Sequence, residues 1–177
     1  MIGVLVSGEG SNLQALIDAG LPIAAVASNK PGVHALARAE LAGIPARVFP
    51  LDRYADRAAR DRDIADWLQL RGVDLVVLAG YMHLLTETFL ERFPDRIVNV
   101  HPSLLPAFPG ARAIDDALTA GVDTTGVTIH YVDEGLDTGA VIRQEPVAVE
   151  PRETLLERIH AVEHRLLPDV VQELCAR

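Results

Sequence analysis

Two polar residues stand two positions apart at the end of an apolar run over residues 97–101. Side chains two apart on a strand point to the same face, so Asn99 and His101 are expected to lie together. An amide can donate a hydrogen bond to a developing oxyanion, and an imidazole can move protons between an amine and a leaving group. The pair therefore suits acyl transfer. The ordinary alternative is a buried Asn and His that only tie down the following loop, because buried polar groups usually have structural partners.

An acidic loop, residues 133–139, gathers three carboxylates: Asp133, Glu134 and Asp137. One carboxylate beside His101 would orient the imidazole and raise its pKa by opposite charge. The residues alone do not say which of the three it is. Asp and Gly are also common turn residues, so an acidic surface turn is the alternative. A metal site is not indicated, because hard cations need several oxygen ligands at regular spacing.

A glycine-containing loop, SGEGSNL, follows the first apolar run and leads directly into a helix. Glycine lets the backbone approach a ligand closely, and the free N–H groups at a helix start bind an anion, so a phosphate fits there. Leu13 stands where a dinucleotide-binding loop would have its third glycine, which argues against a pyrophosphate cofactor. The alternative is that Ser11 merely caps the helix. If a phosphate does bind, the Glu9 carboxylate should point away from it.

Short apolar runs rich in valine and isoleucine alternate with stretches of helical character. The runs cover residues 2–6, 23–27, 46–49, 73–79 and 97–100. Such runs are typical of buried parallel strands, and their alternation with helices predicts right-handed βαβ units. Residues 124–131 and 141–149 are again β-branched, without long helices between them, which predicts antiparallel strands at the sheet edge. The expected fold is therefore α/β: a doubly wound, mostly parallel, twisted, Rossmann-like sheet with antiparallel strands late in the chain. Ligands of such sheets collect at the carboxyl ends of the strands.

The bulk composition suits a small globular protein. A chain of 177 residues, 49% hydrophobic and 23% charged, is expected to form one domain over residues 1–177. Its net charge of -9 opposes binding to nucleic acid or to an anionic membrane, since both need a basic surface. With Cys175 as the only cysteine, neither an intramolecular disulfide nor a cysteine metal cluster can form. No secretion signal or apolar run of about 18 residues is recognised, so a cytoplasmic protein is expected.

Taken together, the three loops resemble the phosphoribosylglycinamide formyltransferases, a family of folate-dependent formyltransferases. The shared stretches are SGEGSNLQ at residues 7–14, LAGYM at 78–82, NVHPSLLP at 99–106 and LDTG at 136–139. The stretch at 99–106 is specific to formyltransferases in general, and the stretch at 7–14 narrows the resemblance to the glycinamide enzymes. The likeness covers nearly the whole chain.

This resemblance implies a reaction. A formyl group passes from the co-substrate 10-formyltetrahydrofolate to the amine of N1-(5-phosphoribosyl)glycinamide, without a metal, in de novo purine biosynthesis. Asn99 and His101 are implied to stabilise the tetrahedral intermediate and to move protons. The resemblance also selects Asp137 as the carboxylate that raises the histidine pKa. The implied partners are small molecules only, and the chain is expected to be a monomer or a homodimer.

Binding residues follow from the resemblance as well. Gly10, Ser11 and Asn12 are implied to hold the substrate phosphate, and His160 and Glu163 to meet the glycinamide end. The implied folate pocket comprises Arg57, Met82, His83, Leu84, Leu85, Asn99, Asp133, Glu134, Gly135, Leu136 and Asp137. Two positions depart from the family pattern. Glu9 stands where a small or neutral polar residue is usual, and His83 stands where arginine is frequent.

Three other functions compete with this one. A formyltetrahydrofolate deformylase uses a similar histidine loop but has no use for a phosphate site. The formyltransferase that acts on initiator methionyl-tRNA needs a second domain, for which 177 residues leave no room. A non-catalytic nucleotide-binding module of the same fold is the third alternative, since one fold hosts many functions. Outside the motifs, His34, His130 and His164 are expected to be structural or surface residues.

Overall fold

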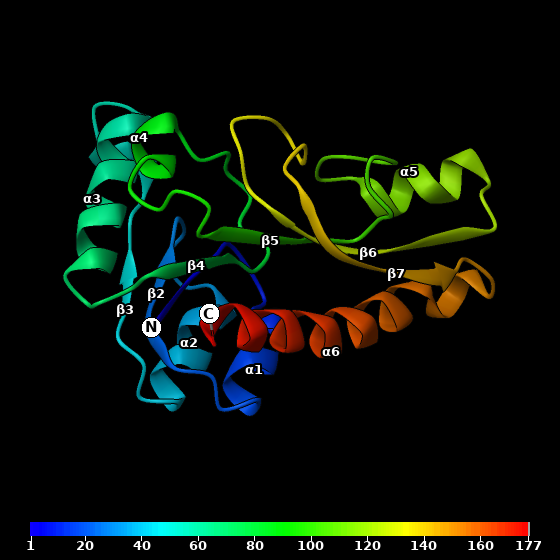
Figure 1. Ribbon diagram of the computed structural model, residues 1–177, viewed down its shortest axis with the longest axis horizontal. Coiled ribbons are helices and arrows are strands. Elements are labelled where there is room, and N and C mark those ends of the chain that lie inside the picture. Colours follow the sequence, from blue (N-terminus) through cyan, green and yellow to red (C-terminus); the bar gives the residue numbers. More distant parts are fainter. Residues whose placement is uncertain (177) are drawn as a thin grey trace. The chain divides into compact units, whose positions relative to one another are not determined.

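The computed structural model of the chain describes residues 1–176. Its strands follow the order β3-β2-β1-β4-β5-β6-β7 in one seven-stranded sheet (Figure 1). The helices and strands, in chain order, are β1 (Ile2–Val6), α1 (Ser11–Asp18), β2 (Ile23–Ser28), α2 (His34–Leu41), β3 (Ala46–Val48), η1 (Leu51–Arg53), α3 (Arg57–Gln69), β4 (Leu75–Leu78), α4 (Glu87–Leu90), β5 (Ile97–His101), α5 (Ala113–Ala120), β6 (Thr124–Tyr131), β7 (Val141–Ala148), η2 (Arg152–Thr154) and α6 (Leu155–Cys175). The sheet is mostly parallel and ends in antiparallel strands, so the predicted fold class is confirmed.

The chain divides into two compact units, Met1–Val98 and Asn99–Arg177, and β5 crosses the boundary between them. The expectation of a single domain over residues 1–177 therefore stays a prediction. No helix in the described part of the chain combines the length and the apolar character that a membrane span needs.

The first unit is a parallel sheet of βα repeats. Strand β1 pairs in parallel with β2 and with β4, and β2 pairs with β3. Every residue of β1 is buried, as expected for a central strand covered on both faces. Helix α3 begins at a true N-cap, because the Asp56 side chain accepts a hydrogen bond from the N–H of Ala59 at 2.8 Å. Its neighbour α4 lies beside it in Figure 1.

The second unit is built on an antiparallel hairpin. Strands β6 and β7 pair from Thr124 opposite Ala148 to His130 opposite Val141, with a register irregularity between Ile129 and His130. Helix α6 packs on both strands. The loop between β6 and β7 lies at the carboxyl end of β6, and β5 ends at His101 in the same unit. This arrangement positions the polar side chains described next.

Candidate functional site

Asn99, His101 and Asp137 lie together in the second unit. The Nδ1 atom of His101 is 3.4 Å from Oδ2 of Asp137, and the Nδ2 atom of Asn99 is 3.5 Å from Oδ1 of the same carboxylate. Asn99 and His101 come from the end of β5, and Asp137 comes from the loop between β6 and β7. The structure thus brings together the pair expected from strand alternation and the carboxylate chosen by resemblance.

The acidic loop itself separates the three carboxylates that the sequence left open. Asp133 accepts hydrogen bonds from the N–H of Gly135 at 3.0 Å and from Oγ1 of Thr138 at 2.7 Å, so it closes its own turn. Glu134 is exposed. Asp137 is the carboxylate beside His101, and its side chain is only 11% exposed.

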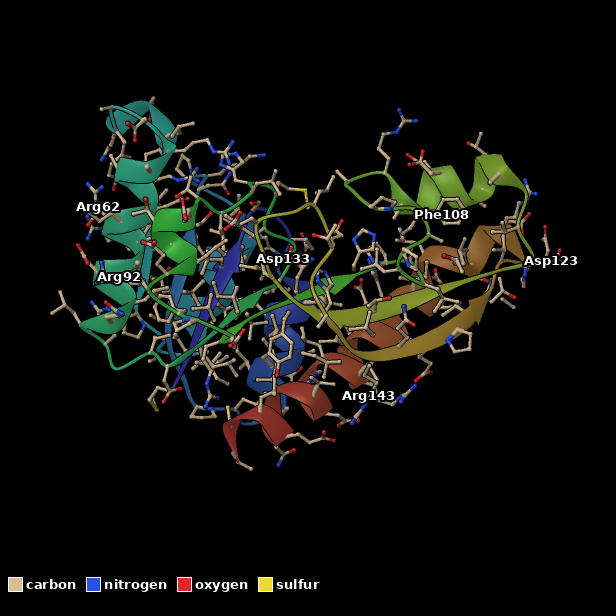
Figure 2. All side chains as sticks on the ribbon, turned by 45° about the horizontal axis from the view of Figure 1, so that its top comes forward. Arg62, Arg92, Phe108, Asp123, Asp133 and Arg143 are labelled. Carbon is tan, nitrogen blue, oxygen red and sulfur yellow. The ribbon has the colours of Figure 1, made fainter. Side chains whose placement is uncertain are left out.

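Both ring nitrogens of His101 face oxygen atoms. Nε2 is 2.8 Å from the carbonyl oxygen of Phe108, and Nδ1 faces the Asp137 carboxylate. A carbonyl and a carboxylate only accept hydrogen bonds, so the doubly protonated imidazolium satisfies both contacts at once. Figure 2 labels Phe108 and Asp133, which mark the two loops that meet here in the second unit. Both ring nitrogens of His101 are therefore placed to donate to oxygen acceptors.

Several groups hold Asp137 as an anion. Burial by itself would raise the pKa of Asp137, but its contact with the His130 ring, the hydrogen bond from the N–H of Gly110 and the nearby His101 outweigh burial. The net result is a pKa below the ordinary value. The Gly110 hydrogen bond is short, at 2.7 Å, and ties the loop after β5 to the acidic loop. Asp137 is therefore ionised at neutral pH.

His130, which the sequence predicts to be a structural or surface residue, lies within this cluster. Its side chain is buried, and its Nδ1 donates to the carbonyl oxygen of Tyr131 at 2.7 Å. That leaves Nε2 as an acceptor for the Asn99 amide at 3.2 Å, with Asp137 Oδ1 at 3.6 Å. The available signal was its position at the carboxyl end of a strand, where ligand-binding residues of this fold collect.

Backbone strain gathers at the same place. Phe108 and Asp137 both adopt left-handed conformations, with φ of 53° and 55°. For residues other than glycine this costs on the order of 1–3 kcal/mol each, and such strain is concentrated at functional sites. Gly139 completes the acidic loop, because a Cβ atom there would lie 1.8 Å from the carbonyl oxygen of Tyr131. The two loops are thus held in one shape.

The residues proposed for the glycinamide end lie on α6. The His160 ring stacks on the ring of His164 with 5.8 Å between their centroids, and Glu163 is buried. His160 and Glu163 thus both lie in the N-terminal half of α6 (Leu155–Cys175).

The predicted phosphate loop lies in the first unit. The N-cap of α1 is Gly10, with φ of 76°, and no side chain within residues 1–176 caps the helix. The alternative that Ser11 is the N-cap is therefore wrong, since Ser11 is already the first residue of the helix. A Cβ at Gly10 would lie 2.6 Å from the Cβ of Ala35, so only glycine fits. The uncapped N–H groups that follow can bind an anion.

Glu9 is engaged by two basic residues of α2. Its carboxylate lies 2.7 Å from Nδ1 of His34 and accepts a hydrogen bond from Arg38 at 2.8 Å. The hydrogen bond with His34, and then that with Arg38, lower the pKa of Glu9. The expectation that this carboxylate turns away from a phosphate fits these contacts, because the acid is paired along α2.

Four of the predicted folate residues of the first unit, Met82 to Leu85, form one loop, and Arg57 at the start of α3 contacts it. Met82 and Leu84 are 60% and 49% exposed, unusual for large apolar side chains, whereas Leu85 is buried. Arg57 donates to the carbonyl oxygen of Leu84 at 2.8 Å. His83 lies half-buried between these residues, and its pKa is lowered by burial and then by Arg60 and Arg57.

Comparisons with known proteins agree on one family. A family model described as formyl transferase matches residues 1–171. The chain is 41% identical to the phosphoribosylglycinamide formyltransferase of Bacillus subtilis (strain 168), over 97% of this chain and 92% of that protein. It is 44% identical to the trifunctional purine biosynthetic protein adenosine-3 of Bos taurus, of which it spans 18%.

Solved structures give the same result. A crystal structure of phosphoribosylglycinamide formyltransferase from Bacillus halodurans matches with a TM-score of 0.95 at 42% identity, over 99% of this chain and 95% of that one. Glycinamide ribonucleotide transformylase 1 from Geobacillus kaustophilus matches with a TM-score of 0.94 at 46% identity, over 98% of this chain and 97% of that one.

Proposed function

Because the chain belongs to the formyl transferase family, we propose that it transfers the formyl group of 10-formyltetrahydrofolate to the amine of N1-(5-phosphoribosyl)glycinamide. The products are the N-formyl glycinamide and tetrahydrofolate, as one step of de novo purine biosynthesis. The observation that carries the proposal is the cluster of Asn99, His101 and Asp137, whose contacts suit an acyl transfer.

The reaction is a nucleophilic substitution at the formyl carbon. The glycinamide amine forms a C–N bond to that carbon, and a tetrahedral intermediate with a negatively charged oxygen results. The bond to N10 of the folate then breaks, the amine loses a proton, and N10 gains one. The protein's part is to stabilise the oxyanion and to supply and accept these protons.

His101 is suited to the proton and oxyanion roles. Its Nε2–H donates to the carbonyl oxygen of Phe108, a neutral acceptor that a negatively charged substrate oxygen can replace. Asp137 stays ionised and faces the opposite ring nitrogen, so it stabilises the imidazolium through charge. The ring can then give its Nε2 proton to the reacting groups.

Asn99 supplies a second donor. One of its two N–H groups points at His130, 3.2 Å away, and this bond sets the direction of the amide. The other faces Asp137 at 3.5 Å, the outer limit of a hydrogen bond, so it is the more easily redirected to a ligand oxygen. His130 is accordingly a positioning residue for Asn99.

The binding roles divide over the other loops. Gly10, Ser11 and Asn12 hold the phosphate at the start of α1, supported by the absence of a side-chain cap within the described residues. Met82 and Leu84, both exposed on the first unit, offer apolar surface to the folate rings. His160 and Glu163 bind the glycinamide end. No metal takes part in this scheme, and a cytoplasmic location without nucleic-acid partners stays a prediction.

The test is an assay of formyl transfer with and without the ribosyl glycinamide acceptor. Turnover that requires the acceptor supports the proposal. Equal hydrolysis of 10-formyltetrahydrofolate without the acceptor would instead indicate a deformylase. The variant His101→Ala should lower kcat by about 100- to 1,000-fold, the usual cost of one oxyanion donor. Unchanged turnover in this variant would remove His101 from the mechanism.

A further inference from the structure

A fully buried ion pair in α3 has no part in the roles given above. The side chains of Arg60 and Asp61 are both 0% exposed. Nε and Nη2 of the guanidinium donate to Oδ1 of the carboxylate at 3.0 and 2.7 Å. Desolvating two charges is expensive, and replacing such a pair by apolar residues is often neutral or stabilising. Stability alone is therefore a weak reason for it.

The remaining polar atoms of this pair contact the loop of residues 81–86. Nη1 of Arg60 lies 2.5 Å from Nδ1 of His83. Oδ2 of Asp61 accepts two hydrogen bonds from Thr86, from its N–H at 2.8 Å and from its Oγ1 at 2.9 Å. One buried dipeptide thus holds the loop at two positions three residues apart.

The contact with Arg60 fixes the protonation of His83. A guanidinium can only donate, so Nδ1 of the ring must accept, and the single proton of a neutral ring resides on Nε2. Nε2 lies 3.2 Å from Nδ2 of Asn29, whose Oδ1 faces Oγ of Ser7. Turning this amide by 180° exchanges its nitrogen and oxygen, and the oxygen then accepts the ring proton. The pKa of His83 is lowered mainly by burial and further by the nearby charges of Arg60 and Arg57, which agrees with a neutral ring.

The same chain of contacts returns to the loop. The Asn29 amide is 2.6 Å from Oγ of Ser7, and this hydroxyl accepts a hydrogen bond from the N–H of Met82 at 2.9 Å. Ser7 opens the predicted phosphate loop. The charged and aromatic groups around His83 are Arg60, Arg57, Asp61, Lys30 and, edge-on at 5.9 Å, Tyr81.

These contacts fasten the loop while leaving two apolar side chains outside. The backbone is held at the N–H of Met82, at the carbonyl of Leu84 and at the N–H of Thr86. The side chains of Met82 and Leu84 nevertheless remain exposed. Fixing an apolar surface before the ligand arrives reduces the ordering cost of binding.

We propose that Arg60 and Asp61 are positioning residues for the folate co-substrate, which act by holding residues 82–86 in shape and His83 as a neutral Nε2–H imidazole. This rests on the proposed function. The family often has an arginine at the position of His83. In this chain the cation is instead buried behind the loop, so binding of the co-substrate does not depend on a charge at His83.

The first measurement is an NMR titration of the His83 ring in the unaltered protein. The expected result is the Nε2–H tautomer and a pKa below the ordinary value of about 6.5. In the double variant Arg60→Met/Asp61→Asn the His83 pKa should rise, because the guanidinium charge is gone. A ring protonated on Nδ1, or one that titrates alike in both proteins, would overturn the proposal.

The second measurement is the KM for 10-formyltetrahydrofolate and calorimetric binding of tetrahydrofolate. The double variant removes both charges together, so no unpaired charge is left buried, and a thermal melt checks that it folds. Its KM and Kd should rise between about tenfold and a hundredfold, because misplacing a positioned group can cost that much. The value of kcat and the KM for the ribosyl glycinamide should stay near those of the unaltered protein. The variant Arg60→Lys, which keeps one donor, should recover part of the loss.

The adjacent Arg-Asp pair provides a matched control. Arg62 is exposed, as Figure 2 shows, and Asp63 contacts Arg47 and Tyr54 instead of the loop. The variant Arg62→Met/Asp63→Asn should therefore leave the folate KM and the His83 titration unchanged. If the unaltered protein binds no tetrahydrofolate, the proposed function fails. If the unaltered protein binds tetrahydrofolate and both double variants bind it as tightly, only the proposed role of Arg60 and Asp61 fails.

Discussion

The substitution Asp137→Asn removes the charge beside His101 while keeping the shape of the side chain. The new amide oxygen can still accept the hydrogen bond from the N–H of Gly110, so the loop should be retained. The amide nitrogen can face Nδ1 of His101 and donate to it, which leaves the ring neutral with its proton on Nε2. The variant therefore tests the charge of Asp137 and not its packing.

The size of the effect follows from the geometry. Two unit charges about 4 Å apart interact by about 1 kcal/mol in water and by about 4 kcal/mol at an effective dielectric constant of about 20. His101 and Asp137 are 3.4 Å apart, and the carboxylate is 11% exposed. A value between these two limits, roughly 2–3 kcal/mol, is the stabilisation of the imidazolium that Asp137→Asn should lose, and it corresponds to a kcat about 30- to 160-fold lower.

Steady-state kinetics measure this loss. The expected result is a lower kcat, with the KM of both substrates nearly unchanged, because the charge acts on the transition state. Asp123→Asn is the control, since Asp123 is an exposed carboxylate of the same unit, labelled in Figure 2. A kcat equal to that of the unaltered protein, or one that falls equally in Asp123→Asn, would refute the electrostatic role.

Three further outcomes are expected. Replacing the buried His130 by Phe should lower the free energy of unfolding by about 1–3 kcal/mol, because the Asn99 amide and the Tyr131 carbonyl lose a partner. The same variant should have a lower kcat. Denaturant titration measures the first effect and steady-state kinetics the second, and an unchanged kcat would show that the role of His130 is purely structural. Gly10→Ala should raise the KM for the ribosyl glycinamide, since its Cβ would collide with α2, whereas an unaltered KM would exclude the phosphate role. Because the pKa of Asp137 is lowered by folding, the ionised carboxylate stabilises the folded state fully above its unfolded pKa of about 3.9, and this stabilisation is lost as pH falls through the folded pKa. The free energies of unfolding of Asp137→Asn and of the unaltered protein should therefore differ at neutral pH and become equal below this range. A difference that stays constant with pH would contradict the lowered pKa.

Local patterns were sufficient for much of the fold. The valine-rich runs predicted the parallel strands because a strand covered on both faces must be apolar throughout, as all of β1 is. Alternation likewise predicted that Asn99 and His101 share a face, and both reach Asp137. These are properties of neighbouring residues, so one segment contains all the necessary information.

Contacts between distant segments were not predictable in the same way. Asp137 lies beside His101 although many residues separate the two in the chain, and its backbone is left-handed at φ 55°, which is uncommon for residues other than glycine. His130 meets Asn99 only through tertiary structure, 31 positions away in the chain. The arrangement of Arg60 and His83 was hidden for a similar reason, since a run of alternating arginine and aspartate looks like a solvated helix face until burial is known.

The two glycines of the phosphate loop are constrained very differently. Gly10 has a left-handed backbone and is pressed against Ala35, whereas a methyl group on Gly8 would meet nothing within 4 Å. A search pattern that demands both glycines would therefore give equal weight to a strict steric requirement and to a position with room for a side chain. In surveys of distant homologues, the joint presence of Gly10 and a small residue at position 35 should be the more discriminating signature, because the two positions share one space.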